Sequence, residues 1–262
     1  MPALSKDRDV LLYECIGQGP PPGDPTTHEF SNVTLAYQAE TLASVVEAAF
    51  EKGLFQERLV DVAGFSLGGR IALAAASTYP RLIRRLHITG VGAARDEYAK
   101  VIIASWKDIL SQESERPRSD SGEAALRAFG WSTILATYSR DFVATMGPER
   151  ILAWVDGVAS QNTLEGVAAL LQQTHSETDE WTPLSMAKRI CQSQGSIAER
   201  GRLKGKLVVG GNDQMATPDE VERLGKELGW DVTVISTSAG HAVPMECARA
   251  WRTDLLDFLS RD

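Results

Sequence analysis

The chain has 262 residues, of which 43% are hydrophobic and 24% charged, and its formal net charge is −8. This composition is typical of one globular domain with room for an inserted subdomain, and a chain of this length can bury a core without disulfides or metals. The acidic balance argues against a nucleic-acid-binding protein and against attraction to an anionic membrane surface, and no apolar run is long enough to predict a membrane span.

The first third of the sequence predicts alternating strands and helices. Residues 10–15 and 59–63 are short apolar runs typical of buried strands, and residues 35–50 between them have one apolar helical face. A helix of small residues is predicted over 67–78, and a third strand over 85–89. This order predicts a parallel sheet with right-handed crossovers.

The pattern then changes, because we find helices and no convincing strand from about residue 92 onward. Helical stretches are predicted over 98–110, 124–146 and 149–174. We interpret residues 92–200 as a helical cap insert that interrupts the sheet.

Strand and helix patterns resume after the insert. They comprise strands over 206–209 and 231–235 and helices over 218–228 and 245–260. The predicted fold class is therefore α/β, a mostly parallel sheet flanked by helices, with a core formed by residues 1–91 and 201–262.

The turn between the strand at 59–63 and the following helix has the pattern G-x-S-x-G, with Ser66 at its centre. A serine on such a tight turn has strained backbone angles, so its neighbours must be small, and Gly64 and Gly68 meet that need. The helix that starts here favours developing negative charge, and the Leu67 amide is the expected oxyanion donor. We predict a nucleophile elbow; the alternative is a chance match in a surface turn.

A serine nucleophile needs a base that a third group orients. Of the four histidines, His241 follows the last predicted strand, at the carboxyl edge of the sheet, and is the expected base. His87 falls inside a predicted strand and is expected in the core, His28 lies in an early loop, and His175 lies in the insert. A solvent-exposed loop position is the alternative for His241.

Asp213 follows the strand at 206–209 directly and is the expected acid. The alternative is that it caps the next helix, although Thr217 and Pro218 mark that helix start better. Asp219 is the second candidate acid.

These motifs resemble those of the α/β-hydrolase superfamily over nearly the whole chain. The segment at 14–19 is similar to the family's D-x-x-G-x-G loop, with Glu14 in place of aspartate, and the G-H pair before the final helix is similar to its histidine loop. The resemblance implies an α/β-hydrolase fold, a Ser-Asp-His triad and a cap over the site.

The elbow and the start of its helix also resemble the menaquinone-pathway lyase that eliminates pyruvate, 2-succinyl-6-hydroxy-2,4-cyclohexadiene-1-carboxylate synthase. That resemblance implies that Arg70 binds an acidic substrate, and a helix-surface ion pair is the alternative. Phe65 stands where tyrosine is common in that family. We expect Arg70 and Phe65 to contact the substrate.

The resemblance also implies three further strands before residues 10–15, the third ending in a loop that donates a second oxyanion amide. Nothing before Val10 supplies them, so we expect a truncated N-terminus. Either the strands at 10–15 and 59–63 pair directly, or another chain supplies the strand between them, or the sequence is incomplete.

Three functions follow as hypotheses. The first is a serine hydrolase acting on a small or acyl ester or thioester, a small-molecule substrate. The second is a lyase like the menaquinone-pathway enzyme, and the third is an inactive binding or assembly module whose protein partner or second copy covers the incomplete sheet. Some aromatic side chains of the insert are candidates to line an acyl pocket or to form core, among them Trp106, Trp131, Tyr138, Phe142 and Trp154.

The sequence predicts no cofactor and no metal site, because it has neither ligand clusters nor a phosphate-cradling loop. Its three cysteines are widely spaced, so a disulfide framework is not expected. The charged N-terminus does not resemble a signal peptide. We expect a reducing compartment, the cytoplasm or an organelle lumen, and not secretion.

Overall fold

The sheet has four parallel strands in the order β1-β2-β3-β4. They are β1 (Val60–Phe65), β2 (Ile83–Thr89), β3 (Lys204–Val209) and β4 (Asp231–Val234). The computed structural model that defines them describes residues 8–19, 30, 32–111, 121–175, 179–194 and 203–260. The predicted parallel sheet flanked by helices is confirmed.

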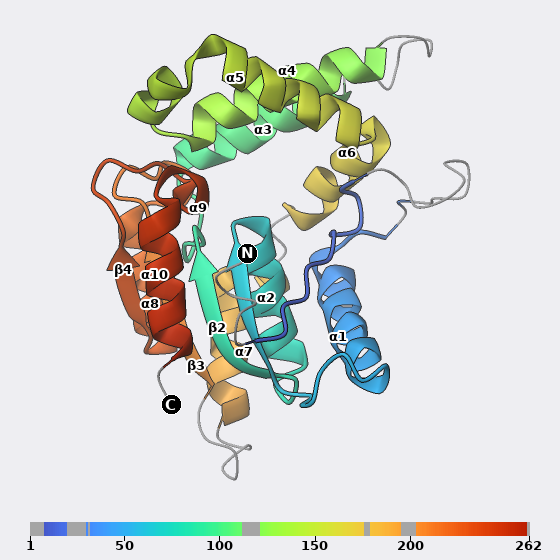
Figure 1. The fold of residues 1–262 in the computed structure, drawn as a ribbon, viewed down its shortest axis with the longest axis vertical. Helices are drawn as coiled ribbons and strands as arrows, with labels where there is room; N and C mark the ends of the chain where they lie inside the picture. The colour runs from blue at the N-terminus through green and yellow to red at the C-terminus, as the bar shows by residue number, and fades with distance from the viewer. Residues whose placement is uncertain are drawn as a thin grey trace.

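A layer of helices covers one face of the sheet (Figure 1). It consists of α1 (Leu35–Glu51), α2 (Leu67–Thr78), α7 (Pro183–Gln194) and α8 (Pro218–Leu228). Helix α1 packs on α2, α2 on α7, and α7 on α8. The alanines of α2 are buried and let it lie close to its neighbours. The main core lies between this layer and the sheet.

Strand β2 sends alternate side chains to the two faces of the sheet, as the pleat requires. Leu86 and Ile88 are fully buried in the main core. His87, between them, has its Nε2 2.9 Å from Asp254 Oδ2 on the closing helix α10 (Ala248–Leu259). Lys206 of β3 contacts the same carboxylate. The expectation that His87 is a packed core residue is confirmed, and its partner explains why a polar ring lies there.

The predicted strand at 10–15 is wrong, because this segment forms no ladder with any described strand. Tyr13 and Cys15 pack against the main core, and Arg8 donates a hydrogen bond to the Leu259 carbonyl at 3.2 Å. An apolar run becomes a strand only beside a partner strand, and among the described strands β1 pairs with β2 alone. Direct pairing between 10–15 and the Leu59 region is therefore also wrong.

Four helices lie above the carboxyl ends of the strands (Figure 1). They are α3 (Glu97–Ser111), α4 (Ser121–Thr137), α5 (Arg140–Gln161) and α6 (Leu164–Thr174). They pack on one another and have apolar clusters of their own. Among the described residues, the other short helices are the 3-10 turn at Asp179–Trp181 and α9 (Val243–Glu246).

The two long helices predicted over 124–146 and 149–174 are instead three helices. The breaks fall where Ser139 and Thr163 accept hydrogen bonds from the backbone N–H groups of Phe142 and Gly166, as N-caps do. The predicted break before 149 is only a kink inside α5, where Gly147 has a φ of 74°.

The cysteines Cys15, Cys191 and Cys247 are all free thiols. Within the described residues, no helix is both long and apolar enough to cross a bilayer.

Candidate active site

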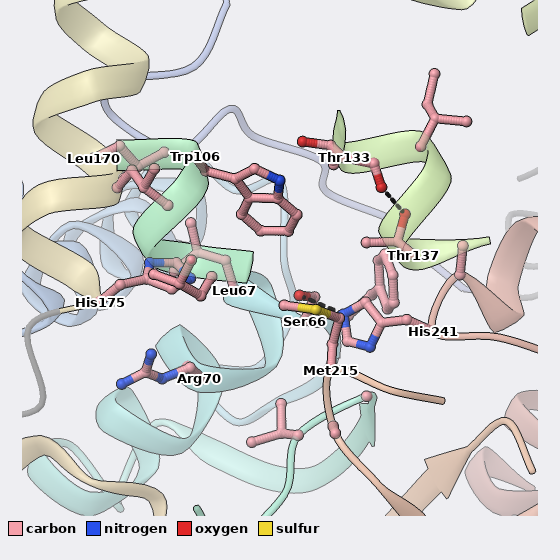
Figure 2. A pocket seen from close by; sticks show the side chains of 18 of the residues that line it. Ser66, Leu67, Arg70, Trp106, Thr133, Thr137, Leu170, His175, Met215 and His241 are labelled. Atoms are coloured by element: carbon pink, nitrogen blue, oxygen red, sulfur yellow. Dashed lines mark hydrogen bonds between the residues drawn. The ribbon is translucent and has the colours of Figure 1, made fainter. Parts of the chain in front are cut away.

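Ser66 lies in the turn between β1 and α2 (Figure 2). Its φ is 51° and its ψ −115°, and it is the one described non-glycine residue with a positive φ. A Cβ on Gly64 would lie 2.6 Å from the Gly68 carbonyl oxygen, so the turn requires glycine there. The turn holds the Ser66 hydroxyl above the sheet edge in the strained conformation expected of an elbow.

His241 lies between Ser66 and Asp213. Its Nε2 is 2.9 Å from Ser66 Oγ, and its Nδ1 is 2.8 Å from Asp213 Oδ2. A carboxylate only accepts hydrogen bonds, so Nδ1 carries the ring proton and Nε2 accepts from the Ser66 hydroxyl. The structure thus brings together the three residues that the sequence predicted as nucleophile, base and acid.

The second oxygen of Asp213 orients the carboxylate. Its Oδ1 accepts hydrogen bonds from the backbone N–H groups of Met215 and Ala216, both at 2.8 Å. The N-cap of α8 is Thr217, so Asp213 does not cap that helix. Asp219, the second candidate acid, lies inside α8.

Phe65 and Gly90 lie against the His241 ring. The Phe65 ring lies 5.2 Å from it, centroid to centroid. Gly90, directly after β2, has a φ of 68°, and a Cβ there would lie 2.8 Å from His241 Cε1. Phe65, predicted to contact substrate, therefore contacts the histidine, and it lines the cavity as well.

Glu246 holds the histidine loop to the helices above it, a role that the sequence did not predict. Its Oε1 accepts from the backbone N–H groups of Gly240 and Ser139, at 3.1 and 3.0 Å, and its Oε2 accepts from the Ser139 hydroxyl. The Ala242 N–H donates to the Thr137 carbonyl at 3.1 Å. No spacing signal links residues a hundred positions apart, so only the fold identifies this contact.

A cavity of about 490 Å³ opens above Ser66, a size ordinary for small-molecule sites. Leu67 lines it, and as the first residue of α2 it has an N–H that no helical carbonyl can accept. That amide remains the predicted oxyanion donor. Gln18, from the N-terminal segment, also reaches this cavity.

Of the five insert aromatics named as candidates, three line the cavity: Trp106, Tyr138 and Trp154. Phe129 of α4 lines it as well. Trp131 packs in the cluster around Val155, and Phe142 stacks on Tyr138. The aromatic wall is therefore shared between the cavity and the core of the helices above it.

Besides His241, three basic residues line the same cavity. Arg70 of α2, predicted to contact substrate, is 6% exposed. Arg95 and His175, which the sequence did not predict as site residues, come from the segment before α3 and the end of α6. Burial lowers the pKa of His175 well below its usual value, and the nearby charges of Arg95, Arg70 and Lys107 lower it further.

The described part of the chain contains no group of three or more His, Cys, Asp or Glu side chains placed to hold a metal ion.

Comparison with known proteins adds a family match. The family model described as "Alpha/beta hydrolase family" matches residues 1–252. Among curated proteins, pyrrolizixenacetamide deacetylase of Xenorhabdus hominickii is 29% identical over 171 residues. The match covers 64% of this chain and 55% of that protein, so the chain spans little more than half the length of this relative.

Solved structures share the fold. A hydrolase from Pseudomonas aeruginosa PA01 matches with a TM-score of 0.70 and 18% identity, covering 99% of this chain and 83% of that one. The enol-lactonase from Burkholderia xenovorans LB400 matches with a TM-score of 0.64 and 16% identity, covering 87% and 74%. At these identities the similarity establishes the architecture alone.

Proposed function

Because this chain belongs to the alpha/beta hydrolase family, we propose that it is a serine hydrolase of small or acyl esters or thioesters, with Ser66 as nucleophile. The observation that carries the proposal is the pair of contacts made by His241, 2.9 Å to Ser66 Oγ and 2.8 Å to Asp213 Oδ2. Hydrogen-bonded in this order, the three groups have the arrangement that activates a serine.

In the proposed reaction Ser66 Oγ attacks the substrate carbonyl carbon while its proton passes to His241 Nε2. Asp213 stabilises the imidazolium, and the Leu67 N–H stabilises the oxyanion. The tetrahedral intermediate expels the alcohol or thiol, which takes the proton from His241. Water then attacks the acyl-serine, giving its proton to His241, and collapse releases the acid as Ser66 Oγ recovers that proton.

The name of the curated relative favours substrates that carry a short acyl group. A deacetylase of an acetamide transfers an acetyl group to water, and only the leaving group differs between an amide and an ester. We therefore include small acyl amides among the substrates to be tested on this chain.

We also propose that the cap over the site consists of α3 to α6 alone. The predicted insert extended to residue 200, but α7 packs on α2 and α8, in the layer that covers the sheet. The cap is joined to the His241 loop through Glu246 and Ser139, so its placement and that of the base depend on each other.

The lyase hypothesis has one supporting observation, the position of Arg70 in the cavity with Ser66. In that case the triad would act as a base on a carbon acid, and Arg70 would bind a carboxylate. Protection of the site by dicarboxylates together with an absence of ester hydrolysis would favour it over the hydrolase.

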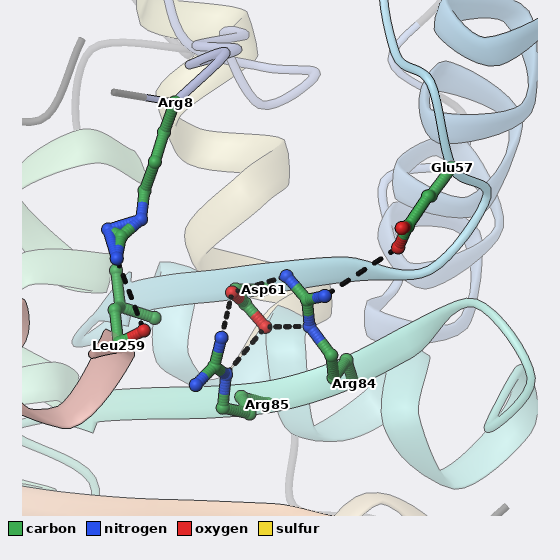
Figure 3. Close-up of polar contacts among 6 residues, drawn as sticks. All are labelled: Arg8, Glu57, Asp61, Arg84, Arg85 and Leu259. Atoms are coloured by element: carbon green, nitrogen blue, oxygen red, sulfur yellow. Dashed lines mark hydrogen bonds and ion pairs between the residues drawn. The ribbon is translucent and has the colours of Figure 1, made fainter. Parts of the chain in front are cut away.

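The hypothesis of an inactive assembly module depends on β1, whose outer edge pairs with no described strand. Asp61 of β1 binds Arg84 and Arg85 of β2, and Arg84 also reaches Glu57 (Figure 3). Burial raises the pKa of Asp61, but the arginine hydrogen bonds and charges outweigh it and lower the pKa. The charged cluster makes this part of the strand pair polar, unlike an apolar docking surface, so we place the catalytic hypothesis first.

A fluorophosphonate probe tests the proposal directly. We expect one covalent adduct on the wild-type protein, located at Ser66 by peptide mass spectrometry, because only an activated serine reacts. Ser66→Ala is expected to abolish the adduct. The control is Ser77→Ala on the same helix, whose hydroxyl bonds the Ala74 carbonyl, and it is expected to label normally. A folded wild-type protein without an adduct would contradict the proposal.

Gly90→Ala is expected to slow fluorophosphonate labelling by about a hundredfold, because its Cβ would displace the His241 ring, and small displacements of catalytic groups cost rates of that order. Gly53→Ala is the matched control. Gly53 has a φ of 69°, against 68° at Gly90, but no atom within 4 Å of the added Cβ. Both variants are expected to lose about 1 kcal/mol of stability from the positive φ, measured by thermal unfolding. Equal labelling rates in the two variants would refute this role of Gly90.

A further inference from the structure

The charged groups on the cavity wall have one sign. The charged side chains are those of Arg70 and Arg95, and none of the described lining residues is an aspartate or glutamate. His175 also lines the cavity, but its lowered pKa leaves its ring neutral. The chain as a whole has a net charge of −8, so a basic wall is not a reflection of its composition.

Arg70 and His175 lie on the same side of Ser66 (Figure 2), and Arg95 lines the same cavity. Burial lowers the pKa of Lys107, and the charge of Arg95 lowers it further. Arg95, Arg70 and Lys107 in turn act together on His175. Like charges brought together away from water repel each other, and a bound anion reduces that repulsion.

The hydrogen bonds around His175 indicate which groups can donate to such an anion. Thr174 Oγ1 donates to the Leu170 carbonyl at 2.6 Å, so it accepts from His175 Nδ1, 2.9 Å away. The neutral ring then has no proton on Nε2. The guanidinium groups of Arg70 and Arg95 are therefore the charged donors on this wall, and their forked geometry suits a carboxylate.

The position of the base indicates which part of a substrate meets these arginines. Figure 2 shows His241 on one side of Ser66, and Arg70 and His175 on the other. His241 must protonate the leaving group, so the leaving group lies on the His241 side. The acyl chain then extends toward Arg70 and His175.

We propose that the substrates are monoesters or monoamides of dicarboxylic acids, whose free carboxylate is bound by Arg70 and Arg95 while Ser66 attacks the other end of the acyl chain. This inference rests on the proposed hydrolase function and adds the substrate class. Products would be the dicarboxylic acid and the alcohol or amine, with one water consumed.

The test compares ethyl hydrogen glutarate with ethyl pentanoate, which has a methyl group in place of the carboxylate. We expect the wild type to hydrolyse the glutarate ester with at least about a tenfold higher kcat/KM. Arg95→Gln is expected to lower the ratio of the two kcat/KM values by about 10- to 100-fold, as loss of hydrogen bonds to a charged group does. The control is Arg249→Gln, at an exposed position of α10, and it should leave the ratio unchanged.

A wild type that prefers ethyl pentanoate, or a ratio that Arg95→Gln does not change, would overturn the inference. If neither ester is hydrolysed and Ser66 does not label, the hydrolase function fails. Calorimetry with glutarate then tests by itself whether Arg70 and Arg95 form an anion-binding site. Glutarate binding that Arg95→Gln weakens would retain the anion site, and no binding at millimolar glutarate would reject it.

Discussion

Replacing His241 with alanine is expected to lower kcat for 4-nitrophenyl acetate by about a million-fold. The imidazole Nε2, 2.9 Å from Ser66 Oγ, is the group placed to take the serine proton, and without it the hydroxyl is a poor nucleophile. The measurement is steady-state hydrolysis, with the unfolding temperature determined in parallel, because the ring is 5% exposed and its removal leaves a buried space.

The control for this loss is a double variant. Residues that act as one unit are strongly non-additive, so Ser66→Ala/His241→Ala is expected to be no slower than either single variant. Two losses that multiplied in the double variant would mean that Ser66 and His241 act independently, and a His241→Ala protein within tenfold of the wild type would contradict the assignment of the base.

Asp213→Asn is expected to lower kcat by about ten-thousand-fold with little change in the unfolding temperature. The N–H groups of Met215 and Ala216 bind Oδ1, so an asparagine is held with its oxygen toward them and its NH₂ toward His241. His241 Nδ1 must then accept, which places the ring proton on Nε2, where it cannot take a proton from Ser66.

The matched control is Asp219→Asn, the same change six residues away, in the first turn of α8. We expect it to keep wild-type activity, since nothing connects that carboxylate to His241. A large loss in Asp219→Asn with none in Asp213→Asn would reverse the assignment of the acid. Proton NMR of the imidazole would show the changed tautomer directly.

The sequence alone was sufficient for features that depend on neighbouring residues. The elbow at Ser66 is such a feature, because the glycine at 64 and the small residues of α2 are local requirements of one turn. The four strands are another, because short apolar runs bounded by turn residues and followed by helices favour strands of a parallel sheet. The chain order serine, acid, histidine then selected His241 from four candidates.

Tertiary structure decided what depends on distant partners. Residues 10–15 are apolar enough for a strand but pair with none of the described strands, and hydrogen bonds between strands cannot be read from one segment. The starts of α5 and α6 are set by the N-cap residues Ser139 and Thr163, whereas Gly147 only kinks α5 and does not end it.

The same limit applies to the site itself. Arg70, Arg95 and His175 are each ordinary residues in their own segments, and only the packing of α2, α3 and α6 around one cavity brings the two arginines and the neutral histidine together on its wall. Glu246 is likewise an ordinary glutamate of a short helix in the sequence, and only the fold places it to accept hydrogen bonds from Ser139 and Gly240. Neighbouring residues determine turns and motifs such as the Ser66 elbow. Contacts between residues a hundred positions apart depend on the free energy of packing the whole chain.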